Sequence, residues 1–323
     1  MIYESLIVGA GPGGLSAALY MARFRRSTLV LHDGKARALR IPTTHNAPGF
    51  NEGVAGPDLI DRMRCHAEQY GATLCETHIA SARHDGAVFT LTDDNGATYR
   101  GRTLILATGI RLNQIDMPQD VHEAAIRAAV LRYCPVCDGF EHIDKRIGVI
   151  GCDTGGAAEA LFLRQYSADI TVVPQRFHEM TADERGAMAA AGIKVVATPV
   201  DHYVATSDCM EVHLKGVPDP LVFDVVYPAL GVAPRTRLAG ELGLSLNDRA
   251  EVEAGAVFET QVPGLYCVGD IVDGLDQISV AMGHGAIAAT KAHNWLREQD
   301  AHTLDALTEE VTVHEGNTGA GAA

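Results

Sequence analysis

The stretch "SLIVGAGPGGLSAALYMARFRRSTLVLHD", residues 5–33, decides the fold, because it reads as one complete β-α-β unit. The apolar "SLIVGAG" predicts a strand, the Ala-rich "PGGLSAALYMARF" predicts an amphipathic helix, and "STLVLHD" predicts a second strand. Three glycines lie between strand and helix in the order Gly9-x-Gly11-x-x-Gly14. Gly9 permits a tight turn, Gly11 lets the backbone approach a pyrophosphate, and Gly14 allows close packing of helix on strand.

An acid and several neighbours complete this candidate nucleotide site. Asp33 closes the second strand about 20 residues after the glycines, where a carboxylate can accept hydrogen bonds from ribose hydroxyls. The start of the helix adds unpaired N–H groups and the positive end of the helix dipole, and both favour phosphate. The other candidate contacts of the turn are Pro12, Gly13 and Gly34. With its strand, helix and terminal acid, the motif favours a nucleotide site over a merely tight turn.

A second strand, turn and helix start at "IGVIG", residues 147–151, and run on into "GCDTGGAAEALFLRQYS" and the strand "ADITVVP". Later come the strand "GLYCVGDIVDG" and the long helix "DQISVAMGHGAIAATKAHNWL". The strands "VVYPALG" (225–231) and "GLYCVGD" are expected to return the chain to the first domain after residue 241. The pattern predicts an α/β protein of two Rossmann-like dinucleotide-binding domains, the second inserted into the first. The expected limits are 1–114 plus 242–323 for the first domain and 115–241 for the inserted one.

The stretch "LRYCPVCDGFEHID", residues 131–144, holds Cys134 and Cys137 with Asp138 directly after them. Zinc needs a second pair of ligands, but the other cysteines are isolated and no histidine pair has metal spacing, so no metal site is predicted. A CxxC at the start of a helix can close a small disulfide ring, and the helix dipole lowers a thiol pKa. Asp138 can shuttle the proton that accompanies thiol exchange. A redox pair is favoured over zinc and over two ordinary cysteines.

Composition excludes several classes of function. Of 323 residues, 47% are hydrophobic and 21% charged, which allows sizeable cores for about two domains. Lys and Arg total 26 against 41 Asp and Glu, and a net charge of −15 repels nucleic acid and anionic membranes. No apolar run approaches the roughly 18 residues of a membrane span, and the N-terminus lacks a leader pattern. Seven scattered cysteines do not resemble a secreted disulfide framework, so we expect a cytoplasmic protein.

Taken together, these pieces resemble the low-molecular-weight thioredoxin reductases over essentially residues 3–298. The matching stretches are "GAGPGG", "HNAPGF", "GVAGPDLIDRMRCHAEQYGA", "ATG", "CPVCDG", "GLYCVGD" and "DQISVAMGHGAIAATKA". The resemblance implies FAD in the split domain and a redox-active pair in the inserted one. By that pattern Cys137 sits against the flavin, Cys134 attacks the partner disulfide, and Asp138 is the general acid and base. The flavin contacts that it implies are Asn46, Thr108, Gly109, Gly269, Asp270, Gln277 and Ile278.

The inserted domain departs from this pattern where NADPH should bind. The turn reads "GCDTGG", with Gly151 in the first position and Asp153 where the second glycine belongs. A side chain there crowds the pyrophosphate, and two like charges at close range cost on the order of several kcal/mol. The family binds the 2′-phosphate with a His-Arg-Arg run and a further arginine, whereas this chain has "QRFHEM" with Arg176 and, later, Arg185. NADPH is therefore doubtful as the electron donor.

Several alternatives stay open. A shifted alignment that uses Gly155 or Gly156 would leave a drifted but working nicotinamide site. Otherwise the electrons come from a protein such as ferredoxin, for which "RFRR" (23–26) with Arg37 and Arg40 is a candidate contact, although solubilising charge explains these arginines as well. The favoured function is reduction of thioredoxin or a similar disulfide by a homodimer. The alternatives are an O2-dependent oxidase of a small dithiol and a non-catalytic, FAD-binding redox sensor.

Overall fold

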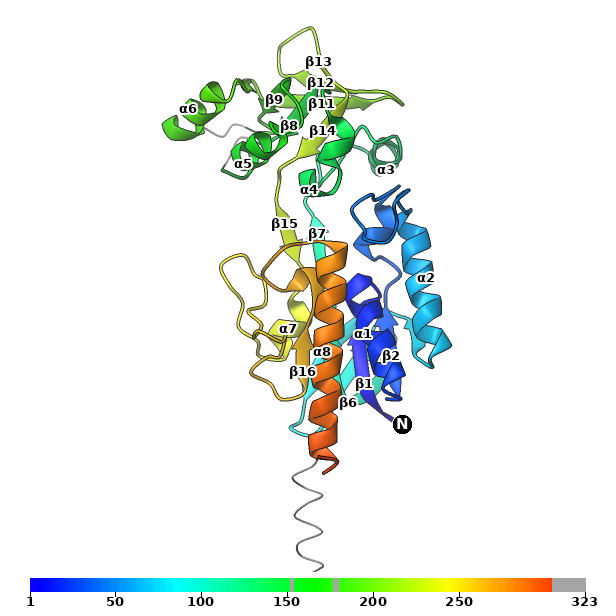
Figure 1. The fold of residues 1–323 in the computed structure, drawn as a ribbon. Coiled ribbons are helices and arrows are strands. Elements are labelled where there is room, and N and C mark those ends of the chain that lie inside the picture. The colour runs from blue at the N-terminus through cyan, green and yellow to red at the C-terminus, as the bar shows by residue number, and fades with distance from the viewer. Residues whose placement is uncertain (152–153, 177–179, 304–323) are drawn as a thin grey trace, which may run out of the picture. The chain divides into compact units, whose positions relative to one another are not determined.

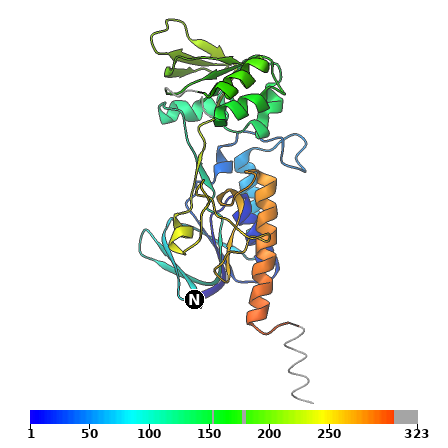
Figure 2. The ribbon, with the colours of Figure 1, turned by 90° about the vertical axis from the view of Figure 1, so that its left-hand side faces the viewer.

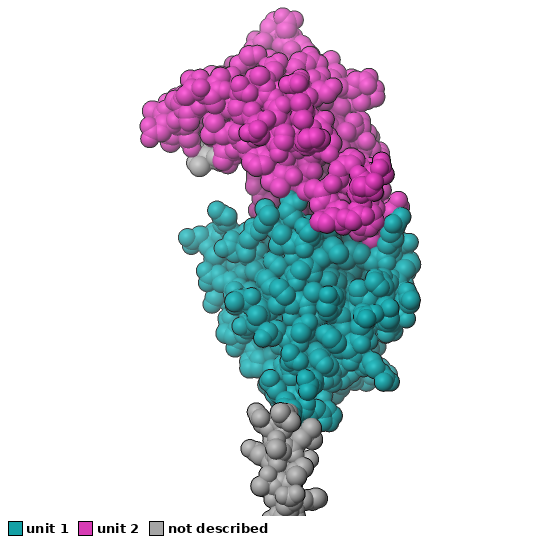
Figure 3. All heavy atoms as spheres, viewed as in Figure 1, with its two compact units in different colours: residues 1–36, 60–109, 234–323 teal, residues 37–59, 110–233 magenta. Residues whose placement is uncertain are grey.

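The computed structural model describes residues 1–151, 154–176 and 180–303. Two compact units divide the chain: unit 1 comprises 1–36, 60–109 and the part from 234 onward, and unit 2 comprises 37–59 and 110–233 (Figure 3). The two-domain α/β architecture is as expected. The domain limits predicted at 114 and 242 stay a prediction. Residues 37–59 belong to the same compact unit as the inserted part.

Unit 1 is built on a seven-stranded sheet of order β3-β2-β1-β6-β5-β4, with β16 also paired to β6. Figure 1 labels β1, β2, β6 and β16 of this sheet. Its strands are β1 (Ile2–Val8), β2 (Thr28–His32), β3 (Thr73–Glu76), β4 (Ile79–His84), β5 (Phe89–Asp93), β6 (Thr98–Leu106) and β16 (Leu265–Cys267). The strands β3, β2, β1, β6 and β16 run parallel, whereas β4 and β5 continue the sheet as an antiparallel meander. Both faces of β1 are buried, with Leu6 in one core and Ile7 in the other, as parallel sheets require.

Small residues let two helices of unit 1 pack against each other. The helix α1 (Pro12–Arg23) lies beside α8 (Ile278–Gln299), which Figure 2 shows along one side of the unit. A Cβ atom added to Gly285 would lie 2.2 Å from the carbonyl oxygen of Gly13, so glycine is needed at this crossing. The Ser16 hydroxyl donates to the carbonyl of Met282 at 2.8 Å. The other helical segments of unit 1 are α2 (Gly56–Gln69, from residue 60 on), α7 (Arg237–Glu241) and the 3-10 turn η3 (Gly269–Ile271).

Unit 2 contains a four-stranded parallel sheet of order β10-β9-β8-β14 and a three-stranded antiparallel sheet. The parallel strands are β8 (Ile147–Ile150), β9 (Ile170–Val173), β10 (Lys194–Val195) and β14 (Val225–Pro228), and the antiparallel ones are β11 (Val200–Ala205), β12 (Met210–Leu214) and β13 (Leu221–Phe223). The short β7 (Ile110–Leu112) and β15 (Val232–Pro234) pair with each other. The helical segments are η1 (Arg37–Arg40), α3 (Gln119–Arg127), α4 (Pro135–Asp138), η2 (Gly139–His142), α5 (Thr154–Leu163) and α6 (Ala182–Ala190).

The expectation that the strand "VVYPALG" leads the chain back to the first domain is wrong, although its residues lie within the limits 115–241 predicted for the inserted domain. Its first four residues form β14, which pairs in parallel with β8 through the whole length of both strands. Val225, Val226 and Tyr227 are completely buried in unit 2, so the strand belongs to the core of the inserted part. Only "GLYCVGD" returns to unit 1, as β16. Within the described residues, no helix combines the length and apolar character needed to cross a membrane.

Candidate functional site

The glycine turn after β1 has the geometry that the sequence predicts. Gly9 has a φ of +110°, and a Cβ atom there would lie 2.2 Å from the carbonyl oxygen of Ala107. A Cβ atom on Gly14 would lie 1.9 Å from the carbonyl oxygen of Gly9. Apart from Gly11 itself and its two neighbours in the chain, none of the described atoms lies within 4 Å of a Cβ built at Gly11. Two glycines are thus required by packing, and the third leaves open space at the start of α1, where a pyrophosphate fits.

A pocket of about 320 Å³ lies at the carboxyl ends of β1 and β2 and is lined by Gly9, Asp33, Thr108 and Arg235, among others. The Thr108 hydroxyl donates to the Arg235 carbonyl at 2.7 Å, and the Arg235 guanidinium lies 3.7 Å from the Asp33 carboxylate. This is the edge of a parallel sheet at which nucleotides bind. The residues therefore fit the adenosine and pyrophosphate part of FAD.

The remaining predicted cofactor contacts of unit 1 lie in turns near this edge. Gly34, Gly109 and Gly269 follow β2, β6 and β16, and each has a positive φ, of 70°, 65° and 73° respectively. Asp270 lies in η3, Gln277 is the N-cap residue of α8, and Ile278 is the first residue of that helix. Pro12 and Gly13 begin α1. Asn46 belongs to unit 2, where its side-chain amide lies 3.4 Å from the carbonyl oxygen of Val136, between the two cysteines.

Cys134 and Cys137 form a disulfide at the start of α4. Cys134 is the N-cap residue, and the Cys137 N–H donates to its carbonyl at 2.9 Å. The helix is only four residues long and passes into the 3-10 turn η2. A macrodipole needs several aligned turns, so the contribution of the helix to thiol acidity is smaller than the sequence suggests.

Asp138 is largely buried beside this disulfide. The Tyr227 hydroxyl donates to its Oδ1 at 2.7 Å. Arg132 Nε lies 3.1 Å from its Oδ2 as an ion pair, without the angles of a hydrogen bond. Burial raises the pKa of Asp138 to about 6, against the opposing effects of Tyr227 and Arg132, and nearby Glu141 adds to the rise. The carboxyl can therefore both release and take up a proton near neutral pH.

Sequence reasoning missed Tyr227 and Arg132. A tyrosine inside an otherwise apolar strand is a signal, because a buried hydroxyl needs a hydrogen-bond partner. The partner of that hydroxyl lies 89 residues away in the chain, so no local pattern reveals it.

Apolar side chains are exposed next to the disulfide. Val136 lies between the cysteines and is 46% exposed, Phe140 in η2 is 72% exposed, and Ile143 just beyond is 45% exposed. Large apolar side chains left open to solvent around a reactive group are typical of a binding surface.

The second glycine turn follows the register of the first. Gly151 has a φ of +143°, and a Cβ atom there would meet the Ala229 carbonyl oxygen at 2.7 Å; one on Gly156 would meet the Gly151 carbonyl oxygen at 2.1 Å. Gly151 and Gly156 thus match Gly9 and Gly14, and by this count the middle position is residue 153. The sequence has aspartate there, and its placement is outside the described residues.

The strand after this turn lacks an acid at its end. The Gly9 N–H donates to the Leu31 carbonyl, and the Gly151 N–H donates to the Val173 carbonyl. Two residues beyond these carbonyls stand Asp33 in unit 1 and Gln175 in unit 2. Arg176 is exposed, and the Arg185 guanidinium donates to the Met180 carbonyl at 2.6 Å.

The candidate basic patch is partly neutralised within the chain. Arg26 pairs with Glu4 at 2.6 Å and with Asp300 at 3.3 Å. Arg40 pairs with Glu123 at 2.7 Å. These contacts favour a structural role for both arginines over docking of an acidic protein. Among the described residues, no group of three or more His, Cys, Asp or Glu side chains is arranged to hold a metal ion.

Comparison with known proteins identifies the family. The model of the pyridine nucleotide-disulphide oxidoreductase family matches residues 3–285. The chain belongs to this family. It is 31% identical to a thioredoxin reductase of Streptomyces coelicolor, over 90% of this chain and 93% of that protein. Its fold matches the crystal structure of HlmI with a TM-score of 0.84 and 27% identity, over 99% of this chain and 98% of that one.

The family match and the similarity to thioredoxin reductases show that the protein is an FAD-dependent disulfide oxidoreductase of the thioredoxin reductase type. An equal identity of 31%, over 90% of this chain and 95% of the relative, links it to a glucosaminate ammonia-lyase of Pseudomonas fluorescens. Similarity at this level therefore does not fix the substrate, which has to be argued from the site.

Proposed function

We propose that the protein exchanges electrons between FAD and the disulfide or dithiol of a thioredoxin-like partner, through Cys134 and Cys137, with a source of electrons other than NADPH. The observation that carries this proposal is the Cys134–Cys137 disulfide directly followed by Asp138, a buried carboxyl with a pKa raised by burial to about 6. The exposed Phe140 and its neighbours support a protein partner at this surface.

The thiol chemistry needs only these side chains. As a thiolate, Cys134 attacks the partner's disulfide, so that one S–S bond breaks and a mixed disulfide forms while a partner thiolate leaves. Cys137 then attacks the sulfur of Cys134, which restores the Cys134–Cys137 disulfide and releases the second partner thiolate. Two electrons pass to the partner, and each leaving thiolate takes up a proton, for which Asp138 is placed as donor. Bound FAD supplies the two-electron store that reduces or reoxidises the cysteine pair.

The second glycine turn supports a donor other than NADPH. Counted along the sequence from Gly151 and Gly156, Asp153 corresponds to Gly11, which leaves space for a pyrophosphate in the first turn. Gln175 stands where an acid would accept hydrogen bonds from ribose hydroxyls, and the Arg185 guanidinium already donates a hydrogen bond to a backbone carbonyl. A protein donor of electrons, such as a ferredoxin, would fit this proposal.

A trapping experiment tests the thiol chemistry. The reduced Cys137→Ser variant should hold a bacterial thioredoxin as a mixed disulfide through Cys134, provided that the thioredoxin lacks its own second active-site cysteine and its remaining cysteine carries thionitrobenzoate as the leaving group. No thiol is then left to resolve the adduct. The adduct is measured by mass spectrometry and by electrophoresis without reductant. The matched Cys134→Ser variant should give little adduct. Equal trapping by both variants, or by neither, would contradict the roles given to the two cysteines.

The aspartate at position 153, which argues against nicotinamide binding, also favours a second candidate, the oxidation of a dithiol by O2. In that direction the partner dithiol reduces the Cys134–Cys137 disulfide, and the overall reaction converts a dithiol and O2 into a disulfide and hydrogen peroxide. No electron donor beyond the substrate is then needed. Addition of a dithiol to the protein in air should yield stoichiometric peroxide, and an absence of peroxide would end this candidate.

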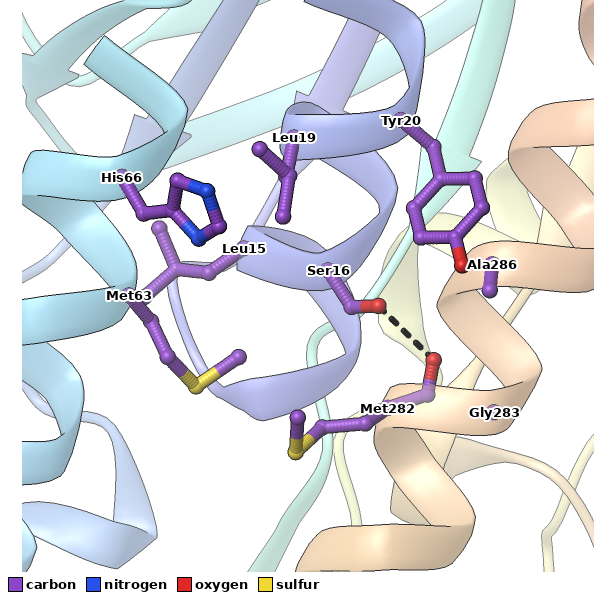
Figure 4. Close-up of a pocket in the computed structure, with 9 residues that line it drawn as sticks. All are labelled: Leu15, Ser16, Leu19, Tyr20, Met63, His66, Met282, Gly283 and Ala286. Carbon is purple, nitrogen blue, oxygen red and sulfur yellow. Dashed lines mark hydrogen bonds between the residues drawn. The ribbon is translucent and has the colours of Figure 1, made fainter. Parts of the chain in front are cut away.

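We also propose that the protein is a homodimer that joins through the α1, α2 and α8 face of unit 1. A pocket of about 320 Å³ on this face is lined mainly by apolar residues (Figure 4). The side chains of Met63 and Met282 extend toward each other across it in Figure 4, and Tyr20 and Met282 are partly exposed. A second copy of this face would remove that apolar surface from water.

A charge at this face should separate the copies. In a two-fold interface Tyr20→Glu appears twice, and each buried, unpaired carboxylate costs several kcal/mol, so association should weaken by roughly a hundredfold or more. Light scattering at micromolar concentrations should show a monomer. The control Val204→Glu, at a similarly exposed position on β11, should leave a dimer. If the Tyr20→Glu variant is still a dimer, the interface lies elsewhere.

A further inference from the structure

One strand of unit 2 fixes both partners of Asp138. Tyr227, on β14, is fully buried, and its hydroxyl reaches Oδ1 of the carboxyl at 2.7 Å. The neighbouring residue Val226 accepts a hydrogen bond from the Arg132 backbone N–H at 2.9 Å, and Leu131 forms a parallel bridge with Val226. The Arg132 side chain then lies at Oδ2. Both oxygens of the carboxyl are thus placed relative to β14.

We propose that Tyr227 is a positioning residue, which holds the Asp138 carboxyl in one orientation beside the disulfide and stabilises its ionised form. Arg132 assists from the opposite oxygen. This inference rests on the proposed proton transfer by Asp138 and adds the group that tunes it. A tyrosine hydroxyl on an apolar strand has no packing advantage over phenylalanine, so its presence points to the hydrogen bond.

The charged and titratable groups around Asp138 come from four segments. Arg132 precedes the disulfide and Tyr227 comes from β14, while Glu141 and His142 belong to η2. Glu141 pairs with His45, from the segment before Asn46, at 2.9 Å. The His142 ring stands edge-on to the Tyr227 ring, with centroids 6.0 Å apart.

Among these groups, Arg132 is the cation that acts on the Asp138 carboxyl. Burial, aided by Arg132, lowers the pKa of His142 to about 4, so that its imidazole is neutral near pH 7. Burial raises the pKa of the Tyr227 hydroxyl, with Asp138 adding to the rise, so the hydroxyl keeps its proton and remains a donor. The carboxylate is therefore stabilised by one hydrogen bond and one ion pair, and it is destabilised by burial and by Glu141.

The sign of the effect of Tyr227→Phe follows from this balance. The variant removes a donor that favours the ionised carboxyl, while burial persists, so the pKa of Asp138 should rise from about 6. A hydrogen bond to a charged group corresponds to about one pH unit or more, a tenfold change in proton affinity. Arg132→Gln removes the cation and should shift the pKa in the same direction.

The test is a direct titration of the carboxyl in the FAD-loaded protein, by NMR with 13C-labelled aspartate and with Asp138→Asn to assign the signal. The midpoint should lie near pH 6 in the unmodified protein and about one unit higher in Tyr227→Phe. The matched control is Tyr203→Phe, because the buried Tyr203 hydroxyl has no partner among the described residues; it should leave the midpoint unchanged. An unchanged or lower midpoint in Tyr227→Phe would overturn the proposal.

A second readout separates this proposal from the function on which it rests. The rate of disulfide exchange with thioredoxin, measured against pH, should show a limb that follows the Asp138 midpoint in each variant and is missing in Asp138→Asn. If Asp138→Asn keeps the limb, proton transfer by Asp138 fails as a function. The positioning by Tyr227 then still stands or falls with the carboxyl titration alone.

Discussion

Serine in place of either Cys134 or Cys137 should leave a folded, yellow protein that no longer exchanges electrons with thiols. The disulfide closes a ring of only four residues, so its loss removes little chain entropy from the unfolded state and should cost little stability. A hydroxyl cannot form the mixed disulfide or resolve it, and the two sulfurs act as one unit. We expect turnover with thioredoxin to fall by on the order of 10³-fold or more.

The double variant is the control for this prediction. Because the two cysteines serve a single sequence of exchanges, the double serine variant should be no slower than either single variant. Flavin content and the thermal unfolding midpoint should match those of the unmodified protein. Turnover within tenfold of normal in a single variant would contradict the mechanism. A full biological role that survives the loss of turnover would favour a redox sensor instead.

Stoichiometric NADPH or NADH should leave the flavin absorbance unchanged in the absence of air, whereas dithiothreitol or dithionite should bleach it. The physical reason is the carboxylate of Asp153 at the middle position of the second turn. The repulsion between a carboxylate and a phosphate about 4 Å apart is about 4 kcal/mol at an effective dielectric constant of about 20. This lowers the affinity for NADPH by close to a thousandfold. Prompt bleaching by NADPH would show that the turn still binds nicotinamide.

Exchanging aspartate and glycine between the middle positions of the two turns tests the charge argument directly. Asp153→Gly should strengthen the binding of NADPH, measured by calorimetry, even if reduction stays slow. Gly11→Asp should weaken the binding of FAD by a similar factor, measured by titration of the stripped protein, because open space at Gly11 lets the variant fold. The matched control is Gly186→Asp on α6, where a Cβ atom also has no neighbour within 4 Å among the described atoms. Unchanged affinities in both turns would refute the charge argument.

The local part of the fold can be predicted from the sequence, and the long-range part cannot. The unit at residues 5–33 folds as predicted, because strand, turn and helix each follow from neighbouring residues. The segment "VVYPALG" is recognisable as a strand, but its sheet is not, since an apolar run does not reveal where it is buried. Whether Gly155 or Gly156 is the third glycine of the second turn also cannot be decided from the sequence. The structure decides it, because Gly156 lies in close contact with the Gly151 carbonyl.

The site shows the same division. The sequence places Asp138 next to the CxxC, but its proton affinity depends on Tyr227 and Arg132, and Tyr227 is far along the chain. Burial, which is the largest influence on that carboxyl, is a property of the packed unit and of no single motif.

The position of β14 has a consequence for how this chain can change over evolutionary time. The strand supports Asp138 through Tyr227, and two residues later Ala229 accommodates the first glycine of the second turn. Remodelling the strand to abolish nucleotide binding would therefore also disturb the acid beside the disulfide. Point substitutions such as the aspartate at 153 avoid that damage, because they leave the strand in place. The loss of nicotinamide binding proposed above would rest on side chains alone, so this architecture keeps the scaffold from which a nicotinamide site could be regained.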